Sequence, residues 1–113
     1  MSPQGYWSIL SIAAELTIVC KGSLDQTNAQ KLRDDIKAAV ETQAVKSVVL
    51  DWVRVDFVDS QALAIPLDLR RTWNFPITLR VAVDSQPARV LKMSSLDAVF
   101  TTDFVPTGES TDN

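Results

Sequence analysis

The sequence predicts an α/β fold, in which one domain has a mixed sheet of four to five strands with helices packed largely on one side. Short β-rich runs alternate along the chain with longer segments of helical periodicity, so the connections between strands are crossovers. The run Val48-Val49-Leu50 is apolar without alternation, which suits a buried parallel strand. With 113 residues, 46% of them hydrophobic, the chain is long enough to bury one sizeable core.

The first part of the chain contains two expected strands and the clearest expected helix. Strands over residues 6–13 and 16–21 turn near Ala14-Glu15 and are predicted to form a hairpin at the sheet edge. Thr27 or Asn28 can cap the helix that follows. Its apolar stripe at helical spacing consists of Ala29, Leu32, Ile36, Ala39 and Val40.

The middle of the chain predicts the central strand and a second helix. The strand is expected over residues 47–52, and the helix is expected to begin after Ser60 and to bury Leu63 and Leu67. Pro66 removes one backbone hydrogen bond from that helix and crowds the preceding turn. We therefore expect a kink or a restart of the helix near Pro66.

The last part of the chain predicts one more helix between two strands. The strands are expected over residues 77–83 and 98–101, and the helix is expected over 85–94, where a serine and a proline mark its start. No repeat, linker or second domain is evident. We expect the domain to span residues 1–101, followed by a frayed polar tail over 102–113.

Composition excludes several classes of function. A formal net charge of −3 and the acidic pI near 4.7 argue against a general nucleic-acid binder, which needs a basic face. The N-terminus lacks the pattern of a signal peptide, and no apolar stretch approaches the length of a membrane span. We therefore expect a cytoplasmic protein that does not insert directly into a membrane. The single cysteine, Cys20, shares a strand face with Leu16 and Ile18 and is expected to be a small buried hydrophobe.

The residues expected for catalysis are missing. The chain has no histidine for proton transfer and no cysteine-histidine pair for a metal, so we expect no enzyme activity, no metal and no cofactor. The carboxylates Asp25, Asp51, Asp56 and Asp59 could form an acid-base pair or a weak cation site, but helix caps and solvated loop ends are the simpler interpretation.

The three tryptophans are expected to differ in their surroundings. Trp52 and Trp73 fall in apolar segments and are expected to lie partly in the core. Trp7 lies near the sheet edge and is the better candidate for an exposed anchor.

The junction of Asp59 and Ser60 is the most informative feature of the sequence. It leads from the buried strand to a helix start, where backbone N–H groups and the helix dipole favour anions and exposed polar side chains. A phosphate or a protein partner could be recognised there. The alternative is that Asp59 and Ser60 only cap the helix.

The same region carries a family resemblance that extends over about residues 16–100. The chain resembles the STAS domain, which is found in anti-sigma factor antagonists and sulphate transporters. The order and spacing of several short motifs carry this resemblance. They are Gly22-Ser23-Leu24-Asp25, Asn28-Ala29 with Leu32, Val48-Val49-Leu50-Asp51, Val55-Asp56-Phe57-Val58-Asp59-Ser60, Ser85-Gln86-Pro87 and Met93-Ser94-Ser95-Leu96.

The resemblance implies a single STAS-like domain with a regulatory loop. In the family, that loop usually reads Asp-Ser-Ser-Gly, and a partner kinase phosphorylates the second serine. Gln61 stands at that position here, and Ala62 replaces the glycine. Ser60 is then the remaining candidate phosphoacceptor. The expected partner-binding and switch loop consists of Asp25, Asp59, Ser60, Gln61, Ala62 and Leu63, with Asp25 brought near Asp59 by the fold.

The resemblance leaves more than one protein partner open. The first reading is a non-catalytic signalling module like an anti-sigma factor antagonist, which docks on an anti-sigma factor of the GHKL kinase type. The alternative is a small cytoplasmic STAS subunit of a lipid-transporting ABC complex, which binds the ATPase. An adaptor in a two-component or chemotaxis system is a third form.

Overall fold

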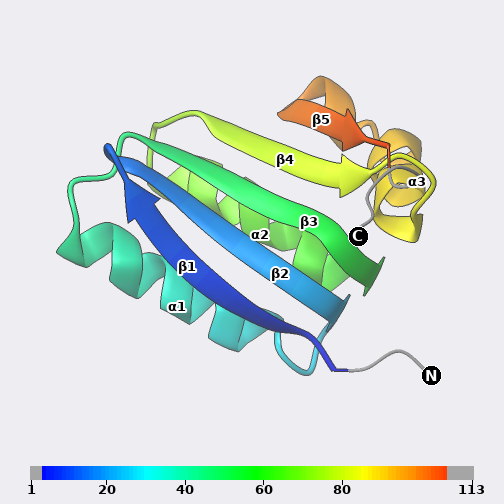
Figure 1. Ribbon diagram of the computed structural model, residues 1–113, viewed down its shortest axis with the longest axis horizontal. Coiled ribbons are helices and arrows are strands. Elements are labelled where there is room, and N and C mark those ends of the chain that lie inside the picture. The colour runs from blue at the N-terminus through cyan, green and yellow to red at the C-terminus, as the bar shows by residue number, and fades with distance from the viewer. Residues whose placement is uncertain (1–3, 107–113) are drawn as a thin grey trace.

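A mixed five-stranded sheet organises residues 4–106, the part of the chain that the computed structural model describes (Figure 1). Its strands lie in the order of the sequence and are β1 (Tyr6–Ile12), β2 (Glu15–Leu24), β3 (Ser47–Val58), β4 (Ile77–Ala82) and β5 (Thr101–Val105). β1 and β2 are antiparallel, and the other neighbouring pairs are parallel. The predicted mixed α/β sheet is confirmed.

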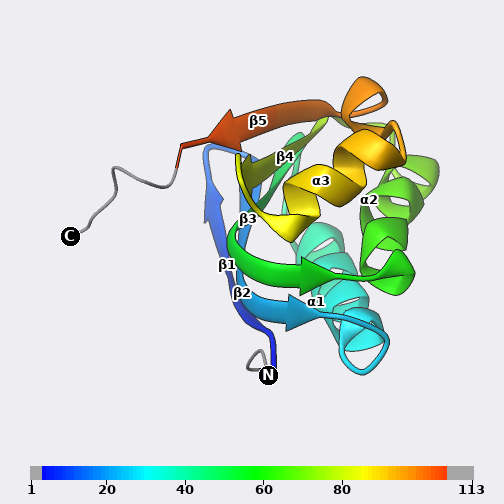
Figure 2. The same cartoon turned by 90° about the vertical axis from the view of Figure 1, so that its right-hand side faces the viewer.

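The helices cover one face of this sheet and leave the other face open (Figure 2). They are α1 (Ala29–Thr42), α2 (Ser60–Thr72) and α3 (Gln86–Met93), and a short 3₁₀ turn, η1 (Leu96–Ala98), follows α3. Each α-helix connects two parallel neighbouring strands, as a crossover requires. Of the helices within residues 4–106, none combines the length and the apolar character needed to cross a bilayer.

The edge hairpin is confirmed, and its turn is unusual for the residues that form it. Ala13 and Ala14 both have positive φ, 52° and 67°. Two consecutive residues with positive φ match the twist of the flanking strands, which is why Asn-Gly is the usual choice in such turns. Two alanines accept this left-handed conformation at a cost, because their Cβ atoms approach the following carbonyl group.

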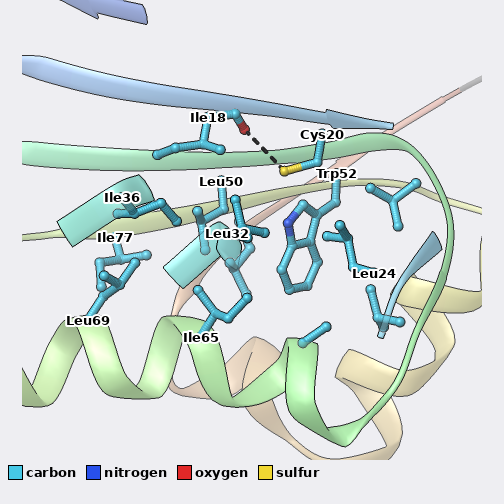
Figure 3. Packing of buried hydrophobic residues seen from close by; sticks show 14 of the residues in the cluster. Ile18, Cys20, Leu24, Leu32, Ile36, Leu50, Trp52, Ile65, Leu69 and Ile77 are labelled. Atoms are coloured by element: carbon cyan, nitrogen blue, oxygen red, sulfur yellow. Dashed lines mark hydrogen bonds between the residues drawn. The ribbon is translucent and has the colours of Figure 1, made fainter. Parts of the chain in front are cut away.

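The core lies between the sheet and the helices (Figure 3). Alternate residues of β2 and β3, such as Ile18, Leu50 and Trp52, point inward and are fully buried. Cys20 is also buried, as predicted, and burial together with the nearby charge of Asp51 raises the pKa of its thiol to about 12. The sulfur is therefore a neutral part of the core at physiological pH.

Two tryptophans differ from their predicted surroundings. Trp52 is completely buried rather than partly buried. Trp73 is half-buried, as predicted, and stacks on Phe75 with ring centroids 6.1 Å apart. Trp7 was expected to be an exposed anchor, and this is wrong. It is half-buried, packs against the core, and its Nε1 donates a hydrogen bond of 2.9 Å to Asp35 of α1.

The second helix also corrects the sequence analysis. Its fully buried stripe consists of Ala62, Ile65, Pro66 and Leu69, whereas Leu63 and Leu67 are only half-buried. Apolar residues occur on several sides of this helix, so spacing alone selected the wrong row. The helix does not restart at Pro66 and is continuous through it.

The remaining differences between the predicted and the observed fold concern where the strands begin and end. β3 continues six residues beyond the predicted end at Trp52, and the last strand covers Thr101–Val105 instead of residues 98–101. Residues 102–105 are thus part of the sheet, which corrects the expected start of the tail. The rest of the expected tail, residues 107–113, lies outside the described part of the chain.

Candidate partner-binding site

The candidate site lies where the parallel strands β2, β3 and β4 end and lead into the three helices. In open α/β sheets, ligands and partners are commonly recognised beyond the carboxyl ends of the strands. The β2–α1 and β3–α2 connections meet directly, because the N–H of Asp59 donates to the carbonyl of Leu24 at 3.3 Å. The two halves of the predicted loop are therefore neighbours in the fold.

Asp59 holds these two connections together with its carboxylate. Its Oδ1 accepts the N–H groups of Gln61 and Ala62 at 2.9 Å and 3.1 Å, which caps α2. Its Oδ2 accepts the N–H of Gln26 at 2.9 Å, across to the β2–α1 loop. One side chain thus satisfies three backbone donors that would otherwise need water or an anion.

This capping corrects the expectation that the helix start favours an external anion. The N–H groups of Gln61 and Ala62 are engaged by the Asp59 carboxylate, and the N–H of Leu63 donates to the carbonyl of Asp59 at 3.0 Å. Two of the amides that would cradle a phosphate are already occupied by a negatively charged carboxylate. The local chemistry therefore favours recognition of exposed side chains over binding of a free anion.

Asp25 begins the second half of the site and stabilises its own loop. Its Oδ1 accepts the backbone N–H of Thr27 at 2.9 Å as well as the Thr27 hydroxyl. The hydroxyl, followed by the backbone N–H, lowers the pKa of the Asp25 carboxyl. Asp25 therefore keeps its negative charge. The next residue, Gln26, links this loop to the start of α2, because its backbone N–H donates to the Asp59 carboxylate.

Asn28 is the buried polar residue that fixes the shape of this loop. It is only 5% exposed, its Oδ1 accepts the N–H of Asp25 at 3.0 Å, and its Nδ2 donates to the carbonyl of Ser23 at 2.9 Å. It precedes α1 as expected for a cap, but its side chain bonds backward to the loop and makes no capping bond to the helix. The sequence pointed to a cap and missed this role.

Gln86 was also missed, and it attaches α3 to the site. Its Oε1 accepts the N–H of Val58 at 2.9 Å, and its Nε2 donates to the carbonyl of Val58 at 3.0 Å. The amide thus pairs with the last residue of β3 as a neighbouring strand would, one residue before Asp59. The only sequence signal was the helix start at Ser85-Gln86-Pro87, which does not reveal a contact 28 residues away.

The predicted site residues differ sharply in exposure. Ser60 and Gln61 are exposed at the first turn of α2, whereas Leu63 is half-buried. Ala62 is fully buried in the core, so it cannot present its side chain to a partner, and its inclusion among the contact residues was wrong. Phe57 was not selected, although 41% of it is exposed two residues before Asp59.

Among the described residues, no group of three or more histidine, cysteine, aspartate or glutamate side chains is arranged to hold a metal ion. The polar groups of the site bind backbone atoms of neighbouring loops. Their arrangement ties the neighbouring loops together and leaves Ser60 and Gln61 exposed.

Comparisons with known proteins agree with this architecture. The chain is similar in fold to an anti-sigma factor antagonist from Mycobacterium paratuberculosis, with 18% identity, a TM-score of 0.79, and coverage of 88% of this chain and 86% of that chain. For the anti-sigma factor antagonist SpoIIAA in its unphosphorylated form, the identity is 19%, the TM-score is 0.71, and the coverage is 86% and 87%.

The phosphorylated form of the Bacillus cell fate determinant SpoIIAA is also similar, with 20% identity, a TM-score of 0.65, and coverage of 86% of this chain and 90% of that chain. At these identities the likeness concerns the fold. The search of curated proteins gave no match. The STAS domain model matches residues 7–111, which is nearly the whole chain, and the protein therefore belongs to the STAS domain family.

Proposed function

We propose that this protein is a non-catalytic regulatory module that binds an anti-sigma factor of the GHKL kinase type through the first turn of α2. The observation that carries the proposal is the position of Gln61. It is exposed at the helix start, and Asp59 holds its backbone in place. Family membership and the fold shared with anti-sigma factor antagonists support this assignment.

The replacement of serine by glutamine determines the expected regulation. Where the family motif carries a phosphorylated serine, Gln61 has no hydroxyl to accept a phosphate, and its neutral amide imitates a phosphate poorly. The protein should therefore behave like a permanently unphosphorylated antagonist. Regulation would then act on its synthesis or its partner, unless the neighbouring Ser60 accepts the phosphate.

The charges around the loop favour the unphosphorylated form. Asp59 and Asp25 place carboxylates beside the helix start, and Asp59 already occupies the amides that would stabilise a phosphate. A phosphate on Ser60 would therefore meet like charges with little compensation from the backbone. Added negative charge should leave the fold intact and weaken binding to an acidic partner surface, more at low salt than at high salt.

The experiment compares two substitutions of exposed glutamines. Gln61→Arg changes the proposed contact, and Gln43→Arg makes the same change at the C-terminal end of the 14-residue helix α1, away from the site. With the anti-sigma partner isolated by pull-down from native lysate, binding isotherms should show a loss of at least tenfold in affinity for Gln61→Arg only. Equal melting temperatures would separate binding from stability, and unchanged affinity of Gln61→Arg would refute the proposed surface.

A second candidate function rests on the same loop. The sequence Asp59-Ser60-Gln61-Ala62 also fits the pattern of small STAS subunits of lipid-transporting ABC complexes, and the small side chain of Ala62 packs into the core at the helix start. Recovery of an ATPase and a permease in the pull-down would favour this function, and recovery of response-regulator or chemotaxis proteins would favour an adaptor. In each case we place the protein in the cytoplasm and expect a protein partner, not nucleic acid.

A further inference from the structure

The outer edge of β1 is a surface that the proposed function does not use. Within residues 4–106, β1 pairs with β2 on one side only, so its other side presents a row of unpaired backbone groups (Figure 1). Its seven residues, Tyr6–Ile12, include no charged residue, proline or glycine. Natural proteins usually protect such edges with charges, prolines or short strands, because an open edge pairs with another strand.

The opposite edge of the sheet has this protection. β5 has five residues, carries Asp103 in an ion pair of 3.3 Å with Arg80, and is followed directly by Pro106. On β1, by contrast, exposed apolar side chains stand on the face of the sheet that no helix covers. Tyr6 is 59% exposed, Leu10 52% and Ile12 73%.

We propose that β1 pairs antiparallel with β1 of a second copy of this chain, which joins the two sheets into one across a two-fold axis at Ile9. The unpaired backbone edge requires a strand as its occupant, and the sequence of β1 complements itself in this register. On the open face, Tyr6 of one copy lies opposite Ile12 of the other, and Ser8 lies opposite Leu10. On the helix side, the large Trp7 lies opposite the small Ser11.

The charges next to β1 support the antiparallel register. Lys21 is the β2 partner of Tyr6 and lies with its Nζ 5.7 Å from the centre of the Tyr6 ring, while Glu15 is the β2 partner of Ile12. In the proposed dimer, each of the two outermost rows across the joined sheets, where Tyr6 faces Ile12, therefore has Lys21 at one end and Glu15 at the other. The same surface patch is used by both copies, as a closed two-fold dimer requires.

The test uses charged variants at exposed positions of the full chain. In a dimer of Leu10→Lys, the two lysines lie on the same face, diagonally across the two-fold axis, and repel each other. In a dimer of Ser8→Glu, the two glutamates lie diagonally across the axis in the same way and also repel each other. When the two variants are mixed, the site of Leu10→Lys in one chain lies directly opposite the site of Ser8→Glu in the other, so opposite charges meet. Analytical ultracentrifugation from micromolar to millimolar protein concentration should show a dimer for the wild type. The dimer dissociation constant should rise at least tenfold for each variant alone and should return toward the wild-type value in the mixture.

Each of the other outcomes would overturn the proposal. A wild-type protein that stays monomeric throughout would leave the edge to an extended segment of a different protein. Variants that dimerise as well as the wild type would place the dimer interface elsewhere, and failure of the mixture to recover would reject the register. Circular dichroism of each variant verifies the fold, which should persist because Ser8 and Leu10 are both exposed.

Discussion

The loop cluster around Asp59, formed by the β2–α1 and β3–α2 connections, and the outer edge of β1 differ in whether their backbone polar groups have partners. In the cluster, the side chains of Asp59, Asn28 and Gln86, one from each of three strand-to-helix connections, satisfy backbone groups at the β2–α1 and β3–α2 connections. At the β1 edge, within the described part of the chain, the outward backbone groups are left unpaired. The contrast lies in the sequence, because the cluster is rich in short polar residues and β1 has few.

This difference indicates two modes of recognition. In the cluster, hydrogen bonds hold the backbone and the side chains of Ser60 and Gln61 are exposed, so a partner that binds there contacts side chains. The β1 edge offers backbone hydrogen bonds and apolar surface, so a partner that binds there must supply a strand. Substitutions of the side chains that hold the cluster backbone should accordingly affect stability, those of the exposed Ser60 and Gln61 should affect partner binding, and those on the edge should affect self-association.

The largest expected effect is at Asp59. Asp59→Ala removes the acceptor for three backbone N–H groups and should lower the free energy of unfolding by about 3 kcal/mol, since bonds to a charged acceptor are among the stronger ones. Asp56→Ala, at an exposed position three residues earlier, should stay within about 0.5 kcal/mol of the wild type. Urea denaturation measures both, and equal losses would show that Asp59 does not organise the cluster.

Asn28 should have the next largest effect. Asn28→Ala leaves the partly buried N–H of Asp25 and carbonyl of Ser23 without their partner, which should cost about 2 kcal/mol. Amide hydrogen exchange should quicken in the β2–α1 loop more than at the β1–β2 turn. Gln30→Ala, two residues away and exposed, is the control, and a similar loss of stability in that variant would contradict the assigned role.

The hairpin turn offers a change of the opposite sign. Replacing Ala13 by Asn and Ala14 by Gly keeps the positive φ at both positions but lowers its cost, and should stabilise the protein by about 1 kcal/mol. Ala38→Gly, at an exposed position within α1, should destabilise by about 1 kcal/mol because glycine is a poor helix residue. Thermal melts compare the two, and a destabilised turn variant would show that the alanine turn is not strained.

The smallest expected effect concerns the titration of Asp25. Its pKa should lie below the ordinary aspartate value of 3.8, mainly because the Thr27 hydroxyl donates to the carboxylate. A depressed pKa stabilises the folded state above the ordinary value, and this contribution disappears as the pH falls through the folded pKa. Thr27→Val should shift the NMR titration midpoint upward, whereas an unchanged midpoint would assign the shift to the backbone N–H alone.

The sequence predicted most of the fold because its patterns are local. The α1 stripe was confirmed at Ala29, Leu32, Ile36 and Val40, since charged and other polar residues occupy most of the rest of that helix. The stripe of α2 was misplaced because apolar residues surround it on several sides and the proline that should have interrupted it is buried in the core. The end of β3 was missed because charged residues break its apolar pattern beyond Trp52.

The candidate site was predictable only in part. Capping chemistry identified Asp59 and Ser60, because a cap is a local signal. The bond from Gln26 to Asp59 and the pairing of Gln86 with Val58 join residues 33 and 28 positions apart, so neither follows from local spacing. The burial of Ala62 likewise depends on which side of α2 faces the sheet.

The most direct test of the proposed function is the mass of the protein after incubation with the proposed GHKL-type anti-sigma partner and ATP. The wild type should gain no phosphate, whereas Gln61→Ser should gain one, because that change restores a hydroxyl at an exposed position that Asp59 already fixes. Gln61→Ala should behave like the wild type. One phosphate on the wild type that disappears in Ser60→Ala, or no phosphate on Gln61→Ser, would contradict the claim that Gln61 occupies the switch position.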